Sequence, residues 1–421
     1  MNPKLKNESP DIRDCRNFES SELEHRSNNL RIEFSPLQCA ELQSISELYQ
    51  SWMQLFQNDP HSSLDQHPDH VIRLIPIFQE THSHLPGQLM QCRREGKLIA
   101  AGILLPKTTN TKALKAVGPA RLLEGYYLCG NSFLCEEIYQ QDEFFLNHLL
   151  TTTVSFCEEQ KAEFLMLEDL LINQPLNRTI PDSASRFLCY SNTEFQNRSL
   201  IHFPENPADY WNRFRPKSKI KQRKRLRQNG EMKLIRVTEP DQVADFLEAA
   251  HQISLNTWQT QRLGLRIKND EKELEEMTFL AINGSLRSYL LMKADQPVAF
   301  KVGYQHKGVY RDLEIGFDLN YASTSPGEAL LLLTLEDLIQ HETPNTYDFG
   351  EGDAEYKQRY CSEITQSRSV FLFPNTLKNK SLLSYLKISR FIDRTMRKIL
   401  KASGIYTALR QLVRYGKLGS R

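Results

Sequence analysis

The 421-residue chain has no long hydrophobic run and almost no net charge. Its longest apolar run, ALLLLTL, is far shorter than the roughly 20 residues that a membrane-spanning helix needs. The first residues, 1–29, are polar and lack the apolar core of a signal peptide. Acidic and basic residues nearly cancel, at a formal charge of +1, which excludes a protein that binds nucleic acid through its overall charge. We therefore expect a cytoplasmic protein with a disordered leader at 1–29.

Cysteine pairs of the kind found in disulfide frameworks or zinc sites are missing as well. The eight cysteines are scattered, without a Cys-x-x-Cys pair, so we expect reduced cysteines that take no part in catalysis. Five histidines lie between residues 58 and 84, but their spacings match no standard metal site. The sequence therefore predicts no metal.

The order of the predicted elements indicates two similar domains. The chain is about twice the usual length of a domain. From residue 30 to 199 the patterns predict a strand, a helix, paired strands, a helix and a strand, and this order returns between residues 200 and 375. We therefore predict an α/β fold with two domains, 30–199 and 200–375, and a basic helical tail at 376–421.

Three motifs of the second predicted domain resemble a known family. A Lys/Arg-rich segment at 218–230 is followed by Ser-Pro-Gly at 325–327 and by DFGEGDAEYK at 348–357. This order resembles the CelD/BcsL-like type of the GNAT acetyltransferase superfamily. The resemblance implies tandem GNAT-like domains, related to FemABX peptidoglycan transferases, each with a mixed central sheet flanked by helices. It also implies a role in surface-polysaccharide biosynthesis.

The Ser-Pro-Gly motif predicts where a cosubstrate binds. Ser325 suits an N-cap, Pro326 suits the first helical position, Gly327 permits close approach to the backbone, and Glu328 follows. Free N–H groups at a helix start bind phosphate well, and the resemblance implies that they hold the pyrophosphate of acetyl-CoA or another acyl-CoA. The fuller Gln/Arg-x-x-Gly-x-Gly/Ala loop of the superfamily is missing, so an ordinary, well-started helix remains the alternative.

The polar stretch after the predicted strand NTYDF carries the candidate catalytic groups. Acyl transfer needs a base for the acceptor proton, and Glu351 and Asp353 are the candidates. Tyr356 is the candidate donor to the leaving thiolate. Asp348 and Lys357 are candidates for binding substrate. The alternative is a solvated loop in which Asp348 bonds to the backbone.

The Lys/Arg-rich segment has too few apolar residues to pack tightly, so its basic side chains face solvent or a polyanion. Lys219 and Arg223 lie four residues apart on one predicted helix face and are our candidates for binding substrate. The polyanions considered are acyl-CoA, a nucleotide-sugar diphosphate, a lipid-linked diphosphate and tRNA. No helix-turn-helix or zinc pattern accompanies the segment, so we expect no DNA binding.

The tail predicts a basic amphipathic helix at 381–403. Its apolar stripe consists of Tyr385, Ile388, Ile392, Met396 and Ile399, and its basic stripe of Lys387, Arg390, Arg394, Lys398 and Lys401. Such a helix fits a peripheral contact with the inner face of a membrane. Packing of the apolar stripe against the protein or a partner is the alternative.

Together these features predict a GNAT-type N- or O-acetyltransferase. It would move an acyl group from acyl-CoA to an amine or hydroxyl of a small molecule or glycan, with a polysaccharide sugar as one candidate acceptor. Two other functions stay open. One is a FemABX-like aminoacyl transferase that uses aminoacyl-tRNA, and the other is a non-catalytic scaffold in polysaccharide assembly.

Overall fold

A computed structural model describes nine stretches of the chain, and the predicted leader, Lys219 and Arg223 lie outside them. The described residues are 30–37, 46–81, 85–112, 114, 120–180, 186–191, 195–214, 232–257 and 267–402. Within these stretches no helix is both long enough and apolar enough to cross a bilayer.

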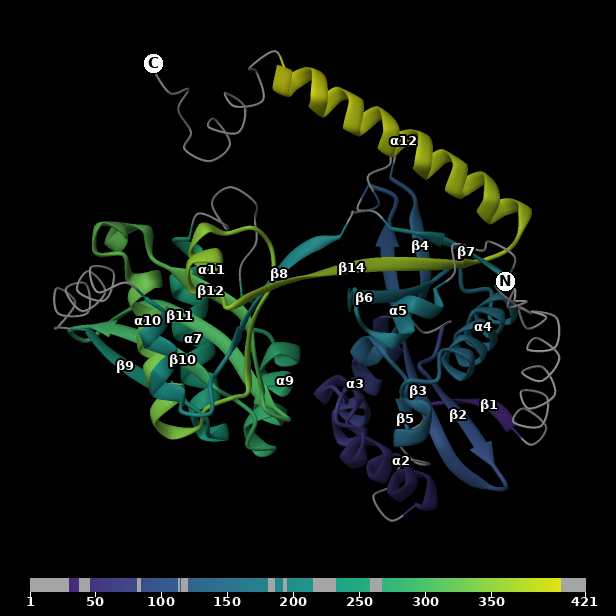
Figure 1. The fold of residues 1–421 in the computed structure, drawn as a ribbon, viewed down its shortest axis with the longest axis horizontal. Helices are drawn as coiled ribbons and strands as arrows, with labels where there is room; N and C mark the ends of the chain where they lie inside the picture. The colour runs from purple at the N-terminus through teal and green to yellow at the C-terminus, as the bar shows by residue number, and fades with distance from the viewer. Residues whose placement is uncertain are drawn as a thin grey trace, which may run out of the picture.

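The centre of the molecule is one continuous mixed sheet of fourteen strands (Figure 1). The strands are β1 (Leu30–Pro36), β2 (Gln88–Arg94), β3 (Lys97–Asn110), β4 (Leu122–Leu128), β5 (Leu134–Cys135), β6 (Leu165–Leu171), β7 (Phe187–Tyr190), β8 (Gln196–His202), β9 (Met232–Val237), β10 (Ser288–Lys293), β11 (Gln296–His306), β12 (Val309–Phe317), β13 (Thr346–Glu351) and β14 (Glu363–Pro374).

α-Helices of 5 to 26 residues and short 3-10 turns lie between these strands or, for the last helix, after them. The α-helices are α2 (Glu47–Asn58), α3 (Pro68–Thr81), α4 (Glu143–Glu159), α5 (Pro175–Thr179), α7 (Val243–Leu255), α9 (Glu271–Ile282), α10 (Pro326–His341), α11 (Glu355–Tyr360) and α12 (Leu377–Ala402). The 3-10 turns are η1 (Leu64–Gln66), η2 (Cys129–Asn131), η3 (Glu137–Tyr139), η4 (Pro207–Arg213), η5 (Pro240–Gln242) and η6 (Leu319–Thr324).

The two halves of the sheet have the same arrangement of strands when each is followed from its outer edge toward the centre. It runs β1-β2-β3-β4-β6-β14-β8-β13-β12-β11-β10-β9, with β5 beside β3 and β7 beside β14. Two pairs of neighbours are parallel, β4 with β6 and β12 with β13, and the other pairs are antiparallel. Each half therefore has four antiparallel strands followed by one parallel strand. The predicted α/β fold, with mixed sheets flanked by helices, is confirmed.

The two central strands cross between the halves. β8 follows the N-terminal half in the sequence, yet it pairs with β13 of the C-terminal half. β14 follows β13 in the sequence, yet it pairs with β6 of the N-terminal half. β8 and β14 also pair with each other, which joins the two halves into one continuous sheet. The domain boundary predicted between residues 199 and 200 falls inside β8, and the predicted domain ranges stay a prediction.

Helices cover both faces of the sheet, and one apolar core runs through both halves. Trp52 of α2 and Val71 of α3 belong to the same core as Phe246 of α7 and Phe279 of α9. On the other face, α4 and α5 pack in a core of the N-terminal half, and α10 packs in a core of the C-terminal half. Because the first core is shared, the halves are held together by packing as well as by strand pairing.

Candidate functional site

The parallel strands β12 and β13 part after a short pairing. Within the described stretch 309–351 they pair only over Val309–Arg311 and Thr346–Asp348, although β12 continues to Phe317. The other edge of β12 stays paired with β11 along its length. Beyond Arg311, the edge of β12 toward β13 therefore has backbone groups with no parallel strand beside it. An extended ligand can pair with such an edge.

A buried charge cluster fixes the strands where they part. Nζ of Lys301 on β11 is completely buried and lies 2.7 Å from Oδ2 of Asp312 on β12 and 2.5 Å from the hydroxyl of Tyr347 on β13. That hydroxyl in turn donates to Oδ2 of Asp312, at 2.8 Å. Burial lowers the pKa of Lys301, and the charge of Asp312 partly offsets this. A buried, hydrogen-bonded cluster of this kind makes its surroundings rigid.

Arg198 of β8 joins two carboxylates at the centre of the sheet. Its Nε lies 2.9 Å from both oxygens of Asp348 on β13, and its Nη2 lies 2.6 Å from Oδ2. Its Nη1 contacts Oδ2 of Asp169 on β6. Asp169 has φ of 56°, an uncommon backbone conformation for any residue except glycine. Arg198 thus links the two halves of the molecule through ion pairs.

The candidate residue Asp348 is used in this link. Besides the ion pair with Arg198, its Oδ1 accepts a hydrogen bond from the backbone N–H of Gly350, at 2.9 Å. Its side chain is buried. The bond to Gly350 agrees with the alternative in which Asp348 bonds to the backbone. The ion pair with Arg198 was not predicted, and contact with a substrate stays a prediction.

The two candidate bases lie at the end of β13 and contact the crossing strands. The hydroxyl of Ser367 on β14 lies 2.8 Å from Oε1 of Glu351 and 2.8 Å from Oδ1 of Asp169. It can donate to only one of them at a time. Oδ1 of Asp353 accepts from the side-chain amide of Asn197 on β8, at 2.8 Å. The fold therefore brings both carboxylates to the seam between the halves, that is, to the paired strands β8 and β14.

The candidates Tyr356 and Lys357 lie on α11, directly after this strand end. Nζ of Lys357 donates to the carbonyl oxygens of Phe349 and Glu351, both at 2.7 Å, and burial lowers its pKa. Tyr356 packs edge-on against Phe349, with the ring centroids 6.2 Å apart. Burial raises the pKa of Tyr356, so its hydroxyl keeps its proton at neutral pH.

The start of α10 differs in one respect from the prediction. Ser325 occupies the N-cap position, but its backbone is left-handed, with φ of 53°, and its side chain makes no capping hydrogen bond. The predicted side-chain cap is therefore wrong, because this backbone conformation does not aim the hydroxyl at the first helical turn. Pro326 is the first helical residue, as predicted. A Cβ atom on Gly327 would lie 3.2 Å from the ring of Phe317.

The carboxylate of Glu328 is engaged inside the protein. Its Oε1 accepts from Nη1 of Arg359, at 3.0 Å, and from the hydroxyl of Tyr360, at 2.8 Å. Both partners lie on α11 or directly at its end. Glu328 therefore ties the first turn of α10 to the element that carries Tyr356 and Lys357.

Sequence reasoning missed several charged residues near the parted strands. Arg311 of β12 lies within electrostatic reach of Asp65 and Asp348. Glu314, on the same strand, reaches solvent, yet the surrounding protein reduces its hydration and raises its pKa. Reduced hydration raises the pKa of Glu273 on α9 to about 7, with repulsion from nearby carboxylates, Glu314 included, as a further cause. The available signal was the charged run RDLE inside a strand.

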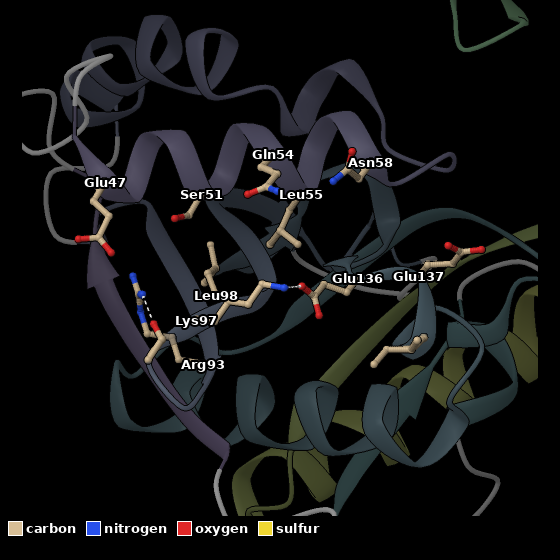
Figure 2. Close-up of a pocket in the computed structure, with 12 residues that line it drawn as sticks. Glu47, Ser51, Gln54, Leu55, Asn58, Arg93, Lys97, Leu98, Glu136 and Glu137 are labelled. Carbon is tan, nitrogen blue, oxygen red and sulfur yellow. Dashed lines mark hydrogen bonds and ion pairs between the residues drawn. The ribbon is translucent and has the colours of Figure 1, made fainter.

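A separate polar hollow of about 750 Å³ lies in the N-terminal half (Figure 2). It opens between α2, the β2–β3 turn and η3, and Lys97 forms an ion pair with Glu136 there. Its lining comprises Glu47, Ser51, Gln54, Leu55, Asn58, Arg93, Gly96, Lys97, Leu98, Glu136, Glu137 and Ile138. None of the predicted site residues is among them. No cluster of three or more His, Cys, Asp or Glu side chains in the described stretches is placed to hold a metal.

Comparison with known proteins finds a family match in the C-terminal half. The family described as acetyltransferase (GNAT) domain matches residues 214–358, a range that contains β12, α10 and β13. No curated protein matches the chain in sequence. Over residues 214–358 the chain is therefore similar to GNAT acetyltransferase domains.

Solved structures are similar over both halves of the chain. The crystal structure of FemX is 11% identical, covers 83% of this chain and 99% of its own, and has a TM-score of 0.54. A tandem GNAT protein from the clavulanic acid biosynthesis pathway is 11% identical, with coverages of 82% and 98% and a TM-score of 0.46. The C-terminal domain of a putative lysylphosphatidylglycerol synthetase from Agrobacterium fabrum is 10% identical, with coverages of 68% and 83% and a TM-score of 0.43. The likeness to FemX shows a shared fold.

Replacing Arg198 by Met is expected to destabilise the protein strongly. The substitution leaves the carboxylates of Asp348 and Asp169 without their cation, and loss of one partner from a buried ion pair costs about 3–5 kcal/mol. Urea denaturation should show the free energy of unfolding falling by this amount. The control His202→Gln, in an exposed pair with Glu363, should change it by about 0.5 kcal/mol or less. Similar effects of the two substitutions would contradict the role of Arg198.

The raised pKa of Glu273 predicts a pH-dependent stability. Between its ordinary pKa of 4.5 and its folded value of about 7, the folded protein binds more protons than the unfolded chain. The free energy of unfolding should therefore fall as pH rises through this window. Glu273→Gln should flatten the fall and stabilise the protein at pH above 7 by about 1–2 kcal/mol.

Thermal and urea unfolding across this pH range measure the effect. The matched control is Glu271→Gln, which changes an exposed carboxylate on the same helix and should leave the slope as it is. A slope that Glu273→Gln does not alter would show that the folded pKa of Glu273 is ordinary.

Proposed function

We propose that this protein is a GNAT-type acyltransferase that moves an acetyl or other acyl group from acyl-CoA to an amine or hydroxyl. The observation that carries the proposal is the parting of β12 from β13 inside the region that matches the GNAT domain family. The free edge of β12 offers backbone hydrogen-bonding groups to an extended ligand with amides of its own, such as the pantetheine arm of CoA. α10 begins shortly after this edge ends.

The start of α10 supports an acyl-CoA donor. The helix is 16 residues long, and the side chain of Ser325 does not cap its first turn. Free N–H groups and the positive end of the helix dipole therefore favour an anion such as a pyrophosphate. We assign this contact to the backbone N–H of Gly327, because Pro326 has no N–H and the N–H of Ser325 donates to the carbonyl oxygen of Ala322. Glu328 has a different task in this proposal, because its carboxylate holds α10 to α11.

Acyl transfer requires a base, and Glu314 fits that role. The acceptor nitrogen or oxygen bonds to the thioester carbonyl carbon, the base takes the acceptor proton, the C–S bond breaks and CoA leaves as a thiolate. The pKa of Glu314 is raised, and a raised pKa makes a carboxylate a better proton acceptor. It also lies on β12 beyond the point where β13 departs.

The residues predicted from sequence then divide the remaining work. Glu351 and Asp353, held by Ser367 and Asn197, are placed to orient an acceptor at the end of β13. Tyr356 keeps its proton because burial raises its pKa, so its hydroxyl can donate a hydrogen bond to the departing thiolate.

The acceptor in this proposal is an amine or hydroxyl of a small molecule or glycan. The motif resemblance to CelD/BcsL-like proteins, at 325–327 and 348–357, supports a sugar of a surface polysaccharide. The fold shared with FemX keeps aminoacyl-tRNA as a second candidate donor. The same binding experiment separates the two donors.

Acetyl-CoA should bind saturably in a calorimetric titration, and Gly327→Val should weaken binding at least about tenfold. The added side chain meets the ring of Phe317 and blocks close approach of a phosphate to the helix start. The matched control is Glu143→Val in the first turn of α4, the equivalent helix of the N-terminal half, which should bind as the native chain does. Lack of binding by the native chain would contradict an acetyl-CoA donor, and a titration with aminoacyl-tRNA would follow.

Glu314→Gln should bind acetyl-CoA normally and lose at least about 100-fold in turnover, the usual contribution of a general base. The measurement is release of the CoA thiol, with water and a panel of amines and sugars as acceptors. Asp353→Asn is the comparison, and it should lose less, because it would affect acceptor orientation alone. Equal turnover of Glu314→Gln and the native chain would exclude Glu314 as the base.

A further inference from the structure

The outer part of α12 presents apolar side chains to solvent. Their exposed fractions are 61% for Ile388, 70% for Phe391, 43% for Ile392, 52% for Met396 and 56% for Ile399. All five lie within four turns of one helix. Burying such side chains is favourable by about 25 cal/mol for each Å² removed from water. Five exposed apolar side chains gathered in one place indicate an interaction site.

The inner part of the same helix is fixed to the body of the protein. Leu382, Leu383 and Leu386 are buried in a core with Phe371 and Phe373 of β14. Further along, Nη1 of Arg390 donates to the backbone carbonyl of Ser191, at 2.5 Å. From there α12 continues to its last residue, Ala402, away from the strands of the sheet (Figure 1). These five exposed side chains, from Ile388 to Ile399, form the outer stripe of an anchored helix, and this stripe does not fold back onto the described body.

Charge identifies the partner that the stripe fits. Residues 377–402 contain eight Lys or Arg residues and a single acidic residue, Asp393. Two copies of such a helix, packed through their stripes, would place two strongly basic helices side by side, which disfavours a dimer. A polyanion such as RNA would use the charges but leave the apolar stripe in water. An anionic bilayer satisfies both, because it takes apolar side chains below its headgroups and basic side chains at its surface.

We propose that α12 is a membrane-docking helix whose outer part, residues 388–399, lies in the surface of an anionic bilayer. Ile388, Ile392 and Ile399 enter the boundary between headgroups and acyl chains, and Lys387 and Lys398 contact the headgroups. The helix lies in the surface and does not cross it, because its opposite face is charged. This inference is independent of the donor and acceptor proposed above.

Flotation of the full chain with lipid vesicles tests this docking. The protein should bind vesicles of phosphatidylcholine with phosphatidylglycerol, should not bind phosphatidylcholine alone, and should be released by high salt. The double variant Ile388→Asn with Ile392→Asn should lower the partition coefficient at least about tenfold. Lys387→Gln with Lys398→Gln should lower it about fivefold for each charge removed.

A matched control removes the same kind of exposed surface elsewhere. Phe144 and Ile282 are 57% and 56% exposed, and Phe144→Asn with Ile282→Asn should bind vesicles as the native chain does. Thermal unfolding should be unchanged in all variants, because every altered side chain is at the surface. Binding by the Ile388 and Ile392 double variant equal to the control would overturn the proposal. A native dimer in light scattering that only this double variant dissociates would also overturn it, and would assign the stripe to a second copy.

Discussion

The ion pairs of Arg198 are the constraint on which the centre of this molecule depends. A buried guanidinium is tolerated only when its charge and its N–H groups are matched. Here the match comes from Asp348 on one side and Asp169 on the other, and those two carboxylates belong to different halves of the sheet. The crossing of β8 and β14 is what brings them within reach. The ion pairs of Arg198 with both carboxylates therefore depend on the exchange of β8 and β14 between the halves.

The candidate site uses the same construction. Glu351 and Asp353 are held by Ser367 and Asn197, which lie on the two crossing strands, so both carboxylates depend on partners at the seam. On the other side of β13, the cluster around Lys301 fixes the strands where they part. Polar contacts thus fix both β12 and β13 close to the point where they part, an arrangement that would preorganise the proposed site without a ligand present.

Much of the fold could be predicted because its signals are local. Periodicity within short windows indicated the strands and helices, and the return of the same order indicated the second half. The exchange of β8 and β14 could not be predicted, because Arg198 and Thr365 pair across 167 positions and no local pattern encodes that distance. Ser325 shows the same limit of local prediction at a single residue. Serine is a common N-cap residue, but here its backbone is left-handed and its side chain does not cap the helix.

The same distinction explains the site. The carboxylates at 348–353 stood out because they are dense in sequence, whereas Glu314 belongs to a strand and is singled out only by its surroundings. Its side chain is exposed, yet the protein nearby reduces the hydration of the carboxylate and raises its pKa, a property of tertiary packing. Density of charge in a sequence therefore locates the end of a strand well, but it does not rank the groups there as acids or bases. That ranking depends on neighbours from α9 and β12, which meet only in the folded chain.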